Sequence, residues 1–301
     1  MPAIIRRTLP PVVTGMVLAA ALAGCGGGGD TAAPAPQEAP PPAVPADQAL
    51  VAQVPQSVSS DGKLVVGTDA SYPPNEFTGP DGTTVIGMDV DLGTAIAQKL
   101  GLTAEFRNSS FDGIIPGIAA GTYEAGMSSF SINDERVQVV DMVSYYTAGT
   151  SVGVRAGNPD NVNADDLCGK AVGVQRGTVQ VDDLAARNQK CASEGKPAIT
   201  VSEFQLQTDV NLALASGRVV AMLADSPVVG YAAQQTNGQI EVLGTPYDAG
   251  PYGIALAKNQ GDFAKAVQGA VQSLIQDGTY QRILEKWNVA NGAITTSEIR
   301  S

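Results

Sequence analysis

The chain has 301 residues, 44% hydrophobic and 16% charged, which is typical of a soluble globular protein with room for two lobes of moderate size. Its 18 basic and 30 acidic residues give a formal net charge of −12, and it contains no run of Lys or Arg. A phosphate backbone is therefore an unsuitable partner, so the composition excludes nucleic-acid binding.

The N-terminus has the pattern of an export signal. Two arginines precede an apolar run over residues 12–22, which is too short for a stable membrane span. The letters LAGC at 22–25 resemble a bacterial lipobox, in which the cysteine thiol is diacylated before cleavage. We expect a lipoprotein signal peptide over 1–24 and a lipid anchor at Cys25, which would place the protein on the extracytoplasmic face of the cell membrane. The alternative is an ordinary signal peptide that contains a cysteine.

Residues 25–60 are dominated by Gly, Pro, Ala and Gln and have few large apolar side chains. Such a segment buries too little surface to offset the entropy lost on ordering. The composition predicts a disordered tether, extended over its proline-rich part at 34–45.

Strands and helices are predicted to alternate in the folded part, which is typical of a mainly parallel α/β sheet with ligands at the carboxyl ends of its strands. In the first half we expect strands over 63–68, 84–87 and 102–107 and helices over 88–100 and 114–120, with Phe111 on the loop at 108–112. In the second half we expect strands over 151–155, 170–175, 219–223 and 252–257, helices over 210–216 and 263–287 (broken at 277–278), and chain crossings near 145–150 and 245–250.

The segment 126–136 has the composition of a carboxylate site. Ser128, Ser129 and Ser131 can donate hydrogen bonds from a loop between a strand and a helix start, and Arg136 supplies a planar fork that matches a carboxylate. The alternative is that the polar residues cap a helix and Arg136 pairs with a neighbouring acid. The turn at 176–178 also feeds a helix and presents backbone N–H groups to an anion.

Nine motifs, in order and in spacing, resemble the solute-binding proteins of polar amino-acid ABC transporters over about residues 61–290. They are VGTDASYPP, GMDVDLGTAIAQKLG, FDGIIPGIAAG, SSFSINDER, VGVQRGT, ALASGR, ADSPV, YGIAL and DGTYQRILEKW. The resemblance implies a type II periplasmic-binding-protein fold, in which two α/β lobes joined by two crossover segments close about a ligand like a hinge. The corresponding boundaries are 61–149 and 250–290 for lobe 1, 150–249 for lobe 2 and 291–301 for a C-terminal tail.

The resemblance also implies a ligand site in the cleft between the lobes. Arg136 would clamp the α-carboxylate with help from Ser131 and the backbone near Thr178, while Asp225 and Ser129 would meet the α-ammonium. The remaining implied positions are Tyr72 and Phe111 as aromatic walls and Asp69 at the tip of the ligand side chain, and the predicted site also includes Gln175 and Ser128. Alternatively, the two aromatic residues belong to the core and the two aspartates cap loops or helices.

Asp69 beside two aromatic residues favours a polar L-amino acid with a cationic or amide-bearing side chain, because rings stack on planar or cationic groups. Three positions depart from the family pattern: Asn75 stands where an aromatic is usual, Val179 where Thr or Ser is common, and Gln175 where glutamine binders have Lys. The implied partners are this ligand and the transporter's permease, with no metal, no cofactor and a monomeric state.

An enzyme is the competing interpretation, because a few dehydratases of cyclic amino acids share this fold. General acid–base chemistry most often uses His, and this chain has none, so we expect a binding protein. We also expect no receptor module, since only 14 residues follow Trp287.

Cys168 and Cys191 are predicted to form a disulfide, because export leads to an oxidising compartment and Cys25 is assigned to the anchor. The alternative is a pair of free, buried thiols.

Overall fold

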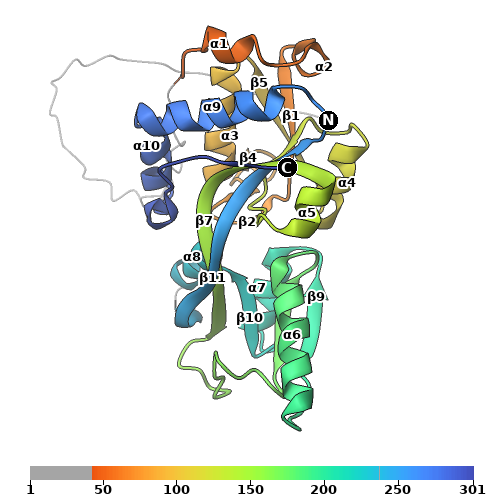
Figure 1. Cartoon of the computed structure of the whole chain (residues 1–301). Coiled ribbons are helices and arrows are strands. Elements are labelled where there is room, and N and C mark those ends of the chain that lie inside the picture. Colours follow the sequence, from red (N-terminus) through yellow and green to blue (C-terminus); the bar gives the residue numbers. More distant parts are fainter. Residues whose placement is uncertain (1–42, 237) are drawn as a thin grey trace, which may run out of the picture. The chain divides into compact units, whose positions relative to one another are not determined.

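The computed structural model describes residues 43–236 and 238–301, so the predicted signal peptide, Cys25 and the first part of the predicted tether lie outside the described residues. This part of the chain forms two α/β lobes joined by two long strands, which confirms the predicted fold class (Figure 1). None of its helices has the length and apolar character that a bilayer span requires.

Lobe 1 is built on the parallel strands β5, β1 and β6, with helices on both faces. Leu64, Val65 and Val66 of β1 are all buried, as expected for a parallel strand covered on both sides. The elements are α1 (Gln48–Val51), α2 (Gln56–Ser59), β1 (Lys63–Thr68), β2 (Ser71–Tyr72), β3 (Glu76–Thr78), β4 (Val85–Ile86), α3 (Met88–Lys99), β5 (Thr103–Asn108), α4 (Phe111–Ala119), β6 (Ala125–Gly126), α5 (Asp134–Val139), α9 (Phe263–Gln276), α10 (Thr279–Lys286), η1 (Ala290–Gly292) and β12 (Ile299–Arg300).

Lobe 2 repeats the parallel arrangement with strands β10, β8 and β9. Its elements are β8 (Ala171–Gln175), α6 (Val179–Ser193), β9 (Thr200–Phe204), α7 (Gln207–Ala215), β10 (Ala221–Asp225) and α8 (Ser226–Gln235). Asp225 ends β10, so its side chain lies at the carboxyl edge of the sheet, where the sequence placed it.

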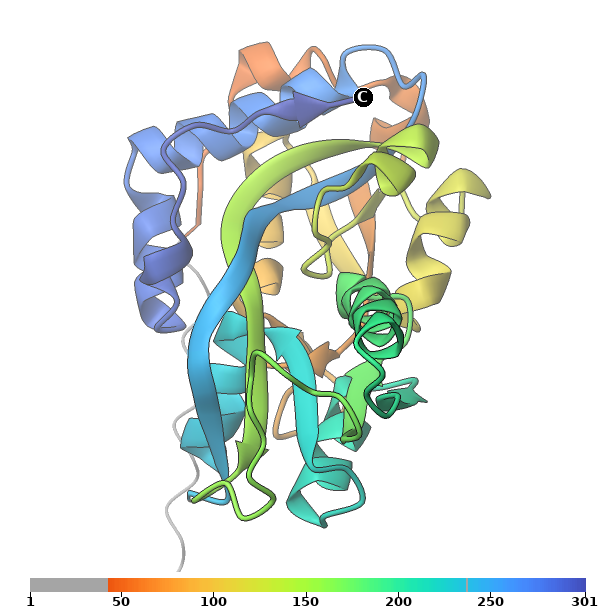
Figure 2. The same ribbon diagram turned by 60° about the horizontal axis from the view of Figure 1, so that its bottom comes forward.

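The strands β7 (Val140–Arg155) and β11 (Ile240–Ala257) pair antiparallel and pass through both lobes (Figures 1 and 2). β11 pairs with β6 at one end, and β7 pairs with β10 at the other, so one sheet has the order β5-β1-β6-β11-β7-β10-β8-β9. The predicted crossings near 145–150 and 245–250 fall inside these strands. The register of the β7–β11 pair shifts between Leu243 and Gly250. Irregular pairing of this kind lets the two strands bend between the lobes with little loss of hydrogen bonding.

Four separate clusters of buried apolar side chains line the faces of the sheet. In lobe 1, one cluster packs Leu92 and Ile96 of α3 against Phe263 of α9, and another lies under α4. In lobe 2, one cluster lies beneath α7 and α8 and another beneath α6. The lobes therefore have their own cores, which suits motion of one lobe relative to the other.

The prediction of a disordered tether is wrong for residues 43–60, which pack on lobe 1. Val54 and Val58 are buried in the core shared with α3 and α9, and the Asp47 side chain caps α1 by accepting from Ala49 N at 2.9 Å. A Cβ at Gly269 of α9 would lie 2.6 Å from a Leu50 methyl, so the glycine makes room for that side chain. A few apolar residues among polar ones were enough, because they bury their side chains in the apolar core of lobe 1.

Two further findings concern the end of the chain and a covalent link. The C-terminal tail is paired to lobe 1, since Ile299 and Arg300 form β12 alongside Val143 and Met142 of β7. Cys168 and Cys191 form a disulfide with Cα atoms 5.7 Å apart.

Candidate ligand-binding site

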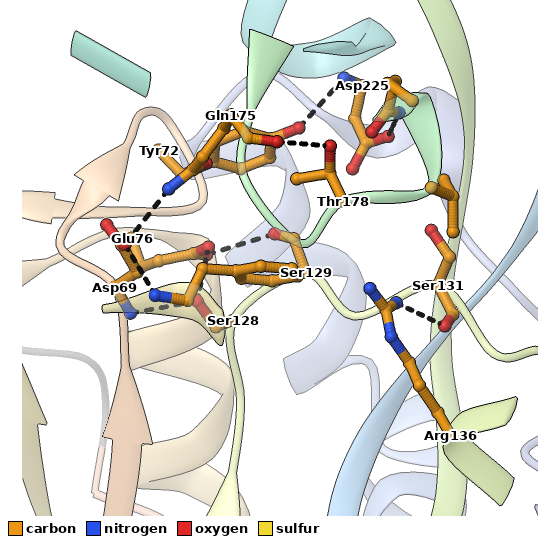
Figure 3. Close-up of a pocket in the computed structure, with 13 residues that line it drawn as sticks. Asp69, Tyr72, Glu76, Ser128, Ser129, Ser131, Arg136, Gln175, Thr178 and Asp225 are labelled. Carbon is orange, nitrogen blue, oxygen red and sulfur yellow. Dashed lines mark hydrogen bonds between the residues drawn. The ribbon is translucent and has the colours of Figure 1, made fainter. Parts of the chain in front are cut away.

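A pocket lies between the lobes at the carboxyl ends of their parallel strands, with about 290 Å³ of space between protein atoms, including its opening to solvent. All ten residues predicted for the site line it, together with Val179, which the sequence analysis named only as a departure from the family pattern, and with Glu76 and Gln180, which it did not name (Figure 3). The lobe 1 contributors are Asp69, Tyr72, Glu76, Phe111, Ser128, Ser129, Ser131 and Arg136, and the lobe 2 contributors are Gln175, Thr178, Val179, Gln180 and Asp225.

Arg136 is half-buried, and its guanidinium bridges the lobes. Nη1 donates to Ser131 O at 2.7 Å (Figure 3), and Nη2 donates to Gly177 O of lobe 2 at 3.1 Å. The guanidinium carbon lies 5.4 Å from the ring centroids of both Phe111 and Phe130, close enough for cation–π attraction. Burial lowers the pKa of Arg136 from its ordinary value, and the charge of Asp225 opposes that shift. The side chain therefore faces the pocket.

The helix-capping alternative is correct for Asn133, whose side chain accepts from Arg136 N at 2.9 Å at the start of α5. It does not account for the guanidinium, whose hydrogen bonds go to two backbone carbonyls. A capped helix start thus positions Arg136 at the pocket.

The three serines divide into two groups. Ser128 and Ser129 donate from their hydroxyls to Glu76, to Oε1 and Oε2 respectively, each at 3.2 Å. Ser129 has a φ of 55°, an uncommon conformation for a residue with a Cβ, and its N–H donates to Asp89 Oδ2 at 3.0 Å. Ser131 instead bridges to Tyr252 of β11 through the backbone. The loop therefore places two hydroxyls beside buried carboxyl groups and one beside Arg136.

Asp225 occupies the N-cap position of α8, but its carboxylate makes no capping hydrogen bond. Oδ1 accepts from Gln180 Nε2 at 2.8 Å, and Oδ2 accepts from Tyr252 Oη at 2.7 Å. Burial raises the pKa of Asp225, while Tyr252 and Gln180 act in the opposite direction. The helix-cap alternative is thus not the role of this side chain, which is held at the pocket wall.

Asp69 offers one free oxygen. Its Oδ2 accepts from Phe111 N at 3.0 Å and from Gln175 Nε2 of lobe 2 at 3.1 Å, whereas Oδ1 has no partner among the described residues. The residue is only 1% exposed, and burial raises the pKa of its carboxyl above the ordinary value. An unpaired buried carboxylate oxygen is costly, so it suits a ligand donor.

Both aromatic residues line the pocket and also pack in a core. Tyr72 joins the cluster beneath α7 and α8 of lobe 2, and its Oη accepts from Asp225 N at 3.0 Å. Phe111 is the first residue of α4, not a loop residue as expected, and stacks on Phe130 at 4.7 Å between centroids. The hydrogen bond from Gly113 N to Ser110 O shows that the helical turn starts before the apolar spacing does.

Other interactions complete the lobe 2 wall. Thr178 donates from Oγ1 to Gln175 O at 2.8 Å, which fixes the turn before α6. Gln180 also donates to Thr150 Oγ1 at 3.0 Å. Gln180 follows the predicted anion-binding turn by two residues, and this position at a helix start was the signal that the sequence analysis did not use.

Glu76 is the most important residue that the sequence analysis missed. It pairs with Tyr72 across the short strands β2 and β3, so the two side chains share one face of the small sheet. An acidic residue directly before Phe77 in a short strand was the available signal.

One group of potential metal ligands occurs among the described residues, namely Asp166, Cys168 and Cys191. Both of its sulfurs are joined in the disulfide, so they are not available as thiolate ligands.

Known proteins resemble this chain in sequence and in structure. Residues 64–290 match the family model of bacterial extracellular solute-binding proteins, family 3. The chain belongs to this family. The arginine-binding protein ArgT of Corynebacterium glutamicum is 35% identical over 246 residues, covering 81% of this chain and 80% of ArgT. The L-cystine-binding protein TcyJ of Escherichia coli is 30% identical, covering 80% of this chain and 87% of TcyJ.

Among solved structures, an ancestral arginine-binding protein bound to arginine is 34% identical, with a TM-score of 0.69, and the match covers 75% of this chain and 98% of that one. The family and these relatives are binding proteins. This family 3 protein is accordingly a solute-binding protein, not an enzyme.

Proposed function

We propose that this family 3 protein captures a polar L-amino acid with a cationic or amide-bearing side chain and delivers it to the permease of an ABC transporter. The observation that carries the proposal is that one pocket has Arg136 from lobe 1 and Asp225 from lobe 2 in its wall. A zwitterion offers a carboxylate to the first and an ammonium to the second. Neither lobe alone has both partners, so binding and closure are one coupled event.

The side-chain preference rests on the opposite end of the pocket. The free Oδ1 of Asp69 accepts a hydrogen bond from an amide, ammonium or guanidinium group, and Tyr72 and Phe111 provide ring surfaces nearby. ArgT and the ancestral protein are both named as arginine-binding proteins, which supports a ligand with a cationic side chain.

Hydrogen bonds between the lobes support the hinge mechanism. Gln175 of lobe 2 donates to Asp69, and Gln205 Nε2 of lobe 2 donates to Asp112 Oδ1 at 3.1 Å. These interlobe bonds support a closed arrangement, in which both lobes contribute to the proposed site.

Melting curves in the presence of each common amino acid test this proposal, because a ligand that binds only the folded state stabilises it by mass action, by about 2.7 kcal/mol at a hundred times Kd. We expect arginine, lysine, histidine or glutamine to raise the Tm more than leucine or glutamate. A larger shift with leucine or glutamate would contradict the proposed ligand class.

We further propose that Cys25 is lipidated and that the mature, monomeric protein is held on the extracytoplasmic face of the membrane. The lipobox-like letters at 22–25 support this, although Cys25 lies outside the described residues. Cys25→Ala is expected to move the protein from the membrane fraction to the medium; an unchanged membrane fraction would contradict the anchor.

A further inference from the structure

Two buried carboxyl groups meet at the floor of the pocket. Glu76 and Asp89 are both 0% exposed. Gly87 brings them together, since a Cβ there would lie 2.1 Å from Asn75 O, and its absence lets Asp89 N donate to Asn75 O at 2.8 Å. The start of α3 is thereby joined to the turn before Glu76. Asp89 lies behind Glu76, and only Glu76 lines the pocket.

Asp89 has stronger anion-stabilising contacts than Glu76, although burial raises its pKa to about 6. Its Oδ2 accepts from Ser129 N at 3.0 Å and from Tyr145 Oη at 2.7 Å, and the residue lies in the first turn of α3, where the helix dipole favours negative charge. Glu76 has weaker partners, the hydroxyls of Ser128 and Ser129. The geometry therefore assigns the negative charge to Asp89 and a proton to Glu76.

The groups around the pair reinforce this distribution. The titratable neighbours of Glu76 are Asp89 of α3, Asp69 after β1 and Tyr72 of β2, and Asp89 also faces Tyr145 of β7. Burial, followed by the negative charge of Asp89, raises the pKa of Glu76 well above its ordinary value. None of the hydrogen bonds described for Glu76 or Asp89 comes from a Lys or Arg side chain.

We propose that a ligand with a cationic side chain binds by exchange: the cation takes its place beside Glu76 and Asp69, and the proton of Glu76 leaves to solvent. The proposal rests on the function proposed above. In the step, the O–H bond of Glu76 breaks, its electron pair stays on the carboxylate, and water or buffer accepts the proton. One positive charge enters and one leaves, so the charge of the buried site is conserved.

Two features make this exchange favourable. Glu76 and Asp89 both accept hydrogen bonds from Ser129, and two buried carboxyl groups that share a site do not both ionise without a compensating cation. The free Oδ1 of Asp69, in a residue 1% exposed, supplies a second acceptor for the same cation and points independently to a ligand donor. A neutral side chain brings no compensating charge, so it leaves the proton on Glu76.

The exchange predicts a specific pH dependence. Where free Glu76 is protonated and the bound complex is not, affinity for a cation rises with pH, by about tenfold per pH unit for one released proton. The increase ends once pH exceeds the raised pKa of Glu76. For a neutral ligand of the same shape, the affinity shows no such rise.

Isothermal calorimetry with L-arginine and its neutral isostere L-citrulline tests the proposal on the wild-type protein. Each titration is run in phosphate and in Tris, whose different heats of protonation reveal proton release, at several values between about pH 6 and 8. Glu76→Gln keeps an acceptor for the serine hydroxyls and removes the proton. Asp91→Asn is the matched control, because Asp91 lies on the same helix but pairs with Lys286 at 2.8 Å outside the pocket.

We expect arginine to release close to one proton, citrulline none, Glu76→Gln to lose the release, and Asp91→Asn to retain it. Arginine binding with equal heats in both buffers would overturn the exchange and leave the proposed capture intact. Release that persists in Glu76→Gln would assign the proton elsewhere and overturn it too. If arginine, lysine and glutamine all failed to bind, the proposed function itself would be wrong. Should the variant not fold, the wild-type comparison of arginine with citrulline decides alone.

Discussion

Replacing Arg136 tests the coupling between ligand charge and lobe closure most directly. In Arg136→Ala the ligand carboxylate is left buried without its partner, which costs on the order of 2–5 kcal/mol, or roughly thirty-fold to several thousand-fold in affinity. The structure places the effect toward the upper end, because the same change removes the 3.1 Å bond to Gly177 O across the cleft. The contacts of the guanidinium with the stacked Phe111 and Phe130 are lost as well.

Arg136→Lys is expected to restore little of this affinity. A point charge cannot donate to Ser131 O, Gly177 O and a carboxylate from one planar fork. The matched control is Arg107→Ala: Arg107 belongs to β5 of lobe 1, pairs with Glu105 at 2.7 Å and does not line the pocket.

Calorimetric titration of the three variants with the ligand identified by the melting curves is the assay. The expected order of affinity is wild type and Arg107→Ala together, then Arg136→Lys, then Arg136→Ala. If Arg136→Ala bound within threefold of wild type, the loop at 126–136 would only cap a helix, and the assignment of the carboxylate site would fail.

Three further predictions concern stability. Replacing Cys168 and Cys191 by serine should lower the free energy of unfolding by roughly 3 kcal/mol in urea titrations, and finding two reactive thiols in the unfolded, unreduced wild type would exclude the bridge. Because the pKa of Glu76 is raised in the folded state, the folded protein keeps a proton that the unfolded chain loses near pH 4. The free energy of unfolding therefore falls by about 1.4 kcal/mol for each pH unit between the unfolded and folded pKa values of Glu76. Glu76→Gln should flatten this decline, and parallel stability curves for variant and wild type would contradict the raised pKa. Val58→Ala should cost about 1–2 kcal/mol in the same titrations, whereas no loss would mean that residues 43–60 do not pack in solution.

Local sequence was sufficient wherever a short stretch carried its own signal. The apolar run of β1 gave a strand with the observed limits, Lys63–Thr68, and Gly101 follows the last turn of α3 with a positive φ. The serine loop and Arg136 were identified as one site because side chains after a parallel strand gather at one edge of the sheet, whatever the rest of the fold does.

Tertiary structure decided the features that depend on partners distant in sequence. Residues 43–60 have the composition of a tether, and they are ordered because Val54 and Val58 join the buried apolar cluster that also contains residues of α3 and α9. The pairing of β12 with β7 joins residues more than a hundred positions apart. Neither segment has a local sequence pattern that predicts this pairing.

The same limit applies to the site. Gln175 of the other lobe donates to Asp69 Oδ2, whereas Asp69 Oδ1 has no partner among the described residues. Glu76 lies near Asp89 because the backbones approach closely at Gly87. Sequence by itself placed ten of the lining residues at the cleft through the motifs that carry them, but it did not place Glu76 or Gln180 there. Only the tertiary structure decided how the pKa values of these groups shift and which of their oxygens stay unpaired. Burial, neighbouring charges and hydrogen-bond partners determine these properties, and all of them arise from the packing of distant segments.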